Sequence, residues 1–133
     1  MKLKPLLPLC ILVLLFGCAK APQPLDPVGV VKAQTDAINK VQIDVATAYF
    51  SDEAIIIAPL GQPKGKEKIH VFMLNLTEVK EHIEIIDLTT DGTNVTGTID
   101  VKNALVAKPV RMNLKPIVLN GRITNWEVGT KAQ

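Results

Sequence analysis

The chain has 133 residues, of which 47% are hydrophobic and 21% are charged, with 15 basic and 13 acidic side chains. Lys2 and Lys4 lie in an N-terminal segment that we expect to be removed, which leaves 13 charges of each sign. A chain without excess positive charge lacks the electrostatic footprint of a nucleic-acid-binding protein, so we expect no nucleic-acid partner. The roughly 116 residues that remain suffice for one domain with a hydrophobic core.

The first 17 residues have the pattern of a signal peptide. Lys2 and Lys4 precede an apolar run, Leu6 to Phe16, that is shorter than the roughly 20 residues a helix needs to cross a bilayer. The run ends in LFGC, which resembles the bacterial lipobox, in which the cysteine is lipidated before cleavage. The alternative is an ordinary secretory signal with a chance cysteine. We expect lipidation of Cys18 and attachment to a membrane through it.

Lipidation at this cysteine has further consequences. The other cysteine, Cys10, lies in the segment to be removed, so the mature chain would have no free thiol for a disulfide, a nucleophile or a zinc site. Because Ala19 rather than aspartate follows Cys18, the resemblance to Gram-negative lipoproteins implies an outer-membrane protein that faces the periplasm. Residues 18–27 contain three prolines and are expected to form an extended tether between membrane and domain.

Residues 28–129 have the pattern of one α+β domain, with a short tail at 130–133. Apolar side chains recur every three to four residues in the first part, a rhythm that places Val41 and Val45 among the buried ones. From Lys80 onward the period is two, and Asp-Gly and Asn-Gly turn signals separate the runs. The predicted order is helix 28–39, helix 43–50, strand 54–60, helix 66–78, and strands 81–90, 94–103, 108–119 and 122–128. This order predicts three helices packed on a curved antiparallel sheet.

Two stretches resemble the nuclear transport factor 2-like superfamily, with its SnoaL-like and ketosteroid isomerase branches. Residues 38–73, INKVQIDVATAYFSDEAIIIAPLGQPKGKEKIHVFM, are similar to the family's helix, acidic turn, short strand ending in proline, glycine-containing loop and helix. Residues 120–128, NGRITNWEV, are similar to its last hairpin with a tryptophan. The resemblance implies a cone-shaped domain and, as in many relatives, a homodimer through the outer face of the sheet. It leaves function open, because the superfamily contains isomerases, cyclases, dehydratases and non-catalytic modules.

Three positions depart from the isomerase branch. The resemblance places a catalytic aspartate before the proline that ends the first strand, but this chain has Ala58 there, which cannot accept a proton. The family's donor tyrosine on the first helix corresponds to Gln34, and its donor aspartate on the penultimate strand to Asn113 or Lys115. We therefore do not expect isomerase chemistry by that route.

Residues 58–69, APLGQPKGKEKI, raise the question of a phosphate-binding loop. Gly61 and Gly65 are one residue too close together for the Walker pattern, and Glu67 stands where a hydroxyl should bind Mg²⁺. Pro63 also removes one amide donor. We expect a turn from strand to helix, with solvated lysines.

Two polar groupings are candidates for chemistry. His82 and Glu84 share one face of a strand and could ligate a metal, but zinc normally takes three protein ligands and the sequence offers no third. We therefore expect a surface pair and no metal. Asp100 could act as a base oriented by Arg111, and the alternative is a solvated cross-strand pair.

The resemblance brings Gln34, Ala58, Phe72, Asn113 and Trp126 together inside the cone. These side chains form either a ligand pocket or a filled aromatic core. The first hypothesis is a non-catalytic module without a cofactor, which binds a small or apolar ligand or a protein partner in the concave sheet. The second is a SnoaL-like isomerase, cyclase or dehydratase that uses a non-standard base such as Asp100 or His82.

Overall fold

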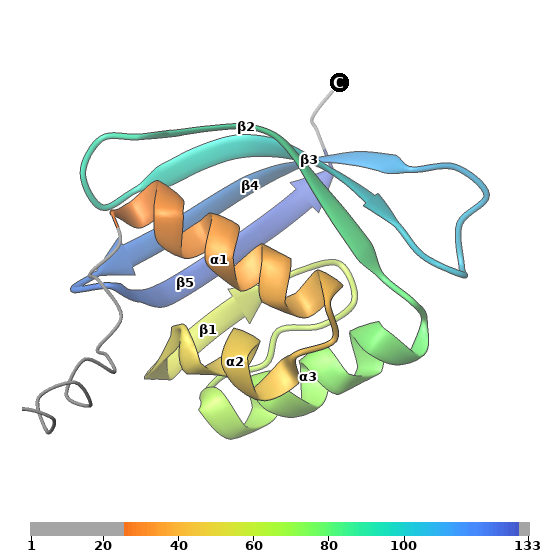
Figure 1. The fold of residues 1–133 in the computed structure, drawn as a ribbon, viewed down its shortest axis with the longest axis horizontal. Helices are drawn as coiled ribbons and strands as arrows, with labels where there is room; N and C mark the ends of the chain where they lie inside the picture. The colour runs from red at the N-terminus through yellow and green to blue at the C-terminus, as the bar shows by residue number, and fades with distance from the viewer. Residues whose placement is uncertain (1–25, 131–133) are drawn as a thin grey trace, which may run out of the picture.

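A computed structural model of the chain describes residues 26–130 (Figure 1). The signal peptide, Cys18, almost all of the tether and the last three residues lie outside this range. Among residues 26–130, no helix is long and apolar enough to cross a membrane. Within this range the structure has eight helices and strands that share one buried hydrophobic core.

The structure confirms the α+β class and the order of the elements. Asp26 caps the first helix by accepting a hydrogen bond from Gly29 N at 2.6 Å, and Pro27 occupies its first turn. The hairpin at Asn120-Gly121 has the two positive φ angles, 51° and 76°, that its turn signal indicates. The elements are α1 (Pro27–Asn39), α2 (Ile43–Ala48), β1 (Phe50–Ile57), α3 (Lys66–Glu78), β2 (His82–Thr90), β3 (Val95–Lys102), β4 (Val110–Leu119) and β5 (Arg122–Thr130).

The five strands form one mixed sheet in the order β1-β5-β4-β3-β2. Strands β2 to β5 make the expected antiparallel meander, and β1 joins its edge by pairing parallel to β5. The other side of β1 is covered by the following loop. Ala58 and Gly61 exchange two backbone hydrogen bonds, and Gly65 N donates to Ala54 O at 2.8 Å. Residues 58–65 are thus a turn that leads into α3, as expected.

The sheet is strongly curved, and a close backbone approach at Gly97 contributes to this. Strand β2 has a bulge between Ile85 and Asp87, and Gly97 on β3 pairs with Leu88, which follows this bulge. A Cβ atom at Gly97 would overlap the backbone oxygen of Asp87, so only glycine fits. Figure 1 shows β2 and β3 bending over α1. This bend gives the domain its concave face.

The helices cover the concave face of the sheet. Figure 1 shows α1 lying across this face, with α2 and α3 beside β1. Two side chains that the helical rhythm placed inside are exposed, because Val41 lies beyond the end of α1 and Val45 points outward from α2. Ala46 and Thr47 are buried instead. The core joins helix and sheet side chains, among them Val30, Val31, Ile38, Ile69, Met73, Ile99, Leu114, Val118, Ile123 and Trp126.

Candidate functional site

A cavity of about 210 Å³ lies between the concave face of the sheet, α1, α3 and two loops. Its lining is mostly apolar and includes exposed side chains of both loops. Leu60 follows β1, and Leu105 belongs to the β3–β4 hairpin; they are 61% and 68% exposed. These two residues mark the mouth. Figure 1 shows the β3–β4 hairpin at the end of the molecule opposite the start of α1. The cavity therefore opens away from the end at which the tether enters the domain.

Four of the five predicted pocket residues line this cavity, namely Gln34, Ala58, Phe72 and Trp126. The Trp126 ring packs against Phe50, with ring centroids 6.0 Å apart and the planes tilted by 52°. The aromatic rings therefore wall the cavity, and the open-pocket alternative describes this domain.

The prediction for Asn113 is wrong. Asn113 pairs with Thr98 on the outer face of the sheet, whereas the cavity is lined by its neighbour Met112. Side chains alternate between the two faces of a strand, so a residue next to a cavity-lining one points the other way. Lys115, the other position considered, is exposed on the same outer face.

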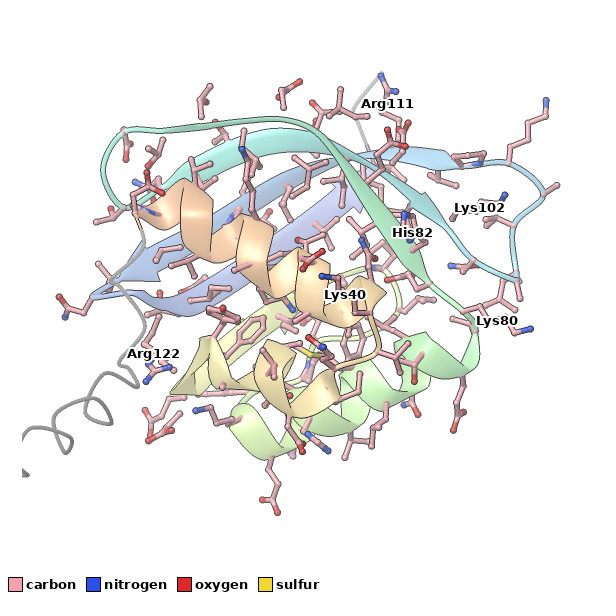
Figure 2. All side chains as sticks on the ribbon, in the orientation of Figure 1. Lys40, Lys80, His82, Lys102, Arg111 and Arg122 are labelled. Carbon is pink, nitrogen blue, oxygen red and sulfur yellow. The ribbon has the colours of Figure 1, made fainter. Side chains whose placement is uncertain are left out.

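The two candidate bases also lie on the outer face. Asp100 receives two hydrogen bonds from Arg111, at 2.6 Å from Nε and 2.9 Å from Nη2. These bonds hold the pKa of Asp100 below its usual value, which makes it a weaker base. Figure 2 shows the Arg111 side chain projecting beyond the sheet, away from the helices. Asp100 thus belongs to a solvated cross-strand pair with Arg111, and it is not a base inside the cavity.

His82 is exposed and pairs with Lys102 across the outer face. Its neighbour Ile83 is buried in the core, so strand alternation directs the imidazole to the outside. Within the described part of the chain, no group of three His, Cys, Asp or Glu side chains could hold a metal ion. His82 therefore has no access to the cavity, and the enzyme hypothesis loses both of its named bases.

Three polar side chains line the cavity: Gln34, Glu81 and Asn103. Gln34 is buried on α1, and its Nε2 lies 4.0 Å from the Met73 sulfur, to which it donates a weak hydrogen bond. Its Oε1 has no hydrogen-bond partner among the residues described. The other two lie together at the mouth, where Asn103 Nδ2 donates to Glu81 Oε1 at 3.3 Å.

Sequence reasoning missed Glu81 and Asn103, although the strand period contains a signal for both. Glu81 is in phase with Ile83, and Asn103 is in phase with Val101, so each continues the inward face of its strand. Burial raises the pKa of the Glu81 carboxyl, and the hydrogen bond from Asn103 lowers it to a smaller extent. Glu81 is thus a half-buried carboxyl with an altered proton affinity at the entrance of an apolar cavity.

Backbone hydrogen bonds fix the position of this pair. Lys80 adopts a left-handed conformation with φ 57°, and Glu81 N donates to Leu76 O at 3.0 Å, which caps the end of α3. Ala104 N donates to Val79 O at 2.8 Å and so joins the β3–β4 hairpin to the same helix end. The mouth is therefore built from two segments that are held together by main-chain contacts.

Solved structures share this architecture. The NTF2-like protein of unknown function from Cytophaga hutchinsonii is 16% identical, with a TM-score of 0.71 over 84% of this chain and 95% of that one. A candidate polyketide cyclase from Sinorhizobium meliloti is 19% identical, with a TM-score of 0.70 over 75% and 93%. A protein with a ketosteroid isomerase-like fold from Catenulispora acidiphila, solved with trimethylamine, is 15% identical, with a TM-score of 0.67 over 77% and 85%.

No family model and no curated protein matches the sequence. The likeness to the solved structures lies in the arrangement of the helices over a curved sheet, and at these identities it concerns the fold alone. It confirms the resemblance drawn from the sequence at the level of the fold. This chain has the nuclear transport factor 2-like fold.

Proposed function

We propose that this protein is a lipid-anchored, periplasm-facing module that binds a small, largely apolar ligand inside the cone. The observation that carries the proposal is the cavity of about 210 Å³, which has an apolar wall and three polar side chains. Apolar pockets with a few well-placed polar groups are the usual form of a small-molecule site. The Catenulispora protein was solved in complex with trimethylamine, which is also a small molecule.

We do not expect the proposed module to catalyse the isomerase reaction. Ala58 lines the cavity at the end of β1, where the resemblance places the catalytic aspartate of the isomerases. A methyl group there offers apolar contact and cannot take up a proton. The resemblance also predicts a homodimer, in which two copies of the chain would associate through the outer face of the sheet.

Filling the cavity tests the proposal. Ala58→Phe in the segment 19–133 should abolish binding of an environment-sensitive apolar dye, because the new ring occupies the space of a ligand. Its free energy of unfolding should change by less than about 1 kcal/mol, since an open cavity accepts the added volume without overpacking. Ala48→Phe is the matched control, because Ala48 is exposed on α2 and lies outside the cavity.

The two variants separate an open cavity from a closed core. Dye fluorescence titrations measure ligand binding, and urea unfolding measures the free energy of unfolding. Both are applied to the unmodified protein, Ala58→Phe and Ala48→Phe. If Ala58→Phe lost about 1–3 kcal/mol of stability and bound the dye like the unmodified protein, the cavity would not be a ligand site. The control variant should bind the dye normally.

A further inference from the structure

Glu81 is the one acidic side chain among the described residues that line the cavity. Within residues 26–130, no nitrogen of Lys, Arg or His lies within 4.0 Å of its carboxyl oxygens. Lys80 and Lys102 lie at the same end of the molecule (Figure 2), yet neither forms an ion pair with it. Glu81 is therefore a carboxyl at the entrance of an apolar space, without a cationic partner among residues 26–130.

Asn103 donates a hydrogen bond to only one of the two carboxyl oxygens of Glu81. Leu105 N donates to Asn103 Oδ1 at 2.8 Å, which fixes the orientation of the side-chain amide. The NH₂ group must then face Glu81, where it donates to Oε1. In the described part of the chain, Glu81 Oε2 receives no hydrogen bond. A carboxylate oxygen can accept more than one hydrogen bond, so this side of Glu81 is open to a donor on a ligand.

We propose that the ligand of this cavity is an apolar amine, with its ammonium group on Glu81 and its hydrocarbon body inside the cone. This inference rests on the proposed function and names the ligand class. A cation replaces the hydration that a carboxylate loses on burial, and the attraction is stronger there than in water. The aromatic rings of Phe72 and Trp126 line the same cavity and suit an aryl or alkyl body. A carboxylic acid would instead bring a second negative charge to Glu81.

The size of the cavity sets the size of the probe. An apolar cavity of about 150 Å³ holds a benzene molecule. A cavity of about 210 Å³ therefore has room for one ring and a short chain. Three probes share such a body and differ in the charge of the polar end: 2-phenylethylamine, 2-phenylethanol and 3-phenylpropionate.

The experiment measures binding of the three probes to the segment 19–133 by NMR titration, which reads the backbone amides of Asn103 and Leu105. We expect the amine to bind about tenfold or more tightly than the alcohol, as a charge-assisted hydrogen bond implies. Glu81→Gln keeps the shape of the side chain and removes its charge, so it should bring the affinities for the amine and the alcohol to within about twofold of each other. Glu84→Gln is the control, because Glu84 lies on β2, three residues after Glu81, but is exposed on the outer face.

The outcomes separate the two proposals. Equal binding of amine and alcohol, or a preference for amine that survives Glu81→Gln, would overturn the amine assignment while the binding function stands. A preference for 3-phenylpropionate would also overturn it and would point to Lys80 and Lys102 as the recognition groups. If no probe and no apolar dye bound, both the ligand class and the proposed function would be wrong.

Discussion

Asn39 and Ile83 exchange two hydrogen bonds that join the end of α1 to the edge strand β2. Asn39 Nδ2 donates to Ile83 O at 2.8 Å, and Ile83 N donates to Asn39 Oδ1 at 2.9 Å. The side-chain amide thus takes the place of a neighbouring strand and satisfies backbone groups at an edge of the sheet. Because Glu81 lies two residues before Ile83, the same contact also holds the mouth of the cavity.

Asn39→Asp tests this exchange with almost no change of shape. A carboxylate still accepts from Ile83 N, but it cannot donate to Ile83 O and leaves that carbonyl without its partner. We expect a loss of about 1–2 kcal/mol at neutral pH, and about 2–3 kcal/mol for Asn39→Leu, which leaves both groups unpaired. Urea unfolding measures both. Asn75→Asp, at an exposed position in the last turn of α3, adds the same charge near a helix end and should cost less than about 1 kcal/mol. A loss for Asn39→Asp no larger than that of this control would show that the exchange does not stabilise the domain.

Val41 adopts a left-handed backbone conformation, with φ 59°, at the end of α1. This conformation is unfavourable for a β-branched residue, and the side chain is 63% exposed, so little packing offsets the strain. Val41→Gly should therefore stabilise the domain by about 0.5–1 kcal/mol, even after the cost of glycine's greater freedom in the unfolded chain. Thermal and urea unfolding check this. Val41→Ala removes the same methyl groups but keeps the strain, and equal stability of the two variants would contradict the explanation.

Local sequence patterns predict the helices and strands of this fold. They predict neither the end of α1 nor the partner of β1. The helical rhythm continues through Val41, although the backbone turns left-handed there and ends the helix. The pairing of β1 with β5 joins segments far apart in the chain, and no local pattern of β1 specifies this partner. Period and turn signals therefore predict the elements, while non-local pairing decides how they assemble.

The candidate site was predicted in part, for a similar reason. Ala58 and Trp126 were placed correctly because the resemblance concerns the fold that positions them. The family correspondence places Asn113 inside the cone, but Met112 and Leu114 of the same strand face inward, so strand alternation directs Asn113 to the outer face. Glu81 was missed because a charged residue at a strand end is usually solvated, and its burial depends on the distant β3–β4 hairpin.

The anchoring at Cys18 lies outside the described residues and stays a prediction of the sequence. Cys18→Ala should leave the precursor unprocessed or release the protein into the soluble periplasmic fraction, since the lipobox cysteine carries the acyl chains. Labelled palmitate should enter the unmodified protein and not the variant. Cys10→Ala is the matched control, because this cysteine lies inside the predicted signal peptide and should not affect labelling. Absence of label from the unmodified protein would show that the lipobox interpretation is wrong.

The carboxyl of Glu81 should make the stability of the ligand-free domain depend on pH. Burial raises its pKa above the ordinary value of 4.5, so the folded protein retains a proton that the unfolded chain releases. The stability that this proton contributes is fully present below the unfolded pKa and is lost as the pH rises through the folded pKa. Glu81→Gln removes this titration, so the variant should gain stability relative to the unmodified protein over that pH range.

Urea unfolding at intervals from pH 4 to pH 8 gives the free-energy difference between Glu81→Gln and the unmodified protein. Asp91 and Asp100 have lowered pKa values and act in the opposite direction, but they are present in both proteins and cancel in the difference. Glu84→Gln, on the outer face of β2, provides the baseline of an exposed carboxyl. The difference for Glu81→Gln should rise with pH and then level off. A difference that is flat, or that falls with pH, would mean that burial does not raise the pKa of Glu81.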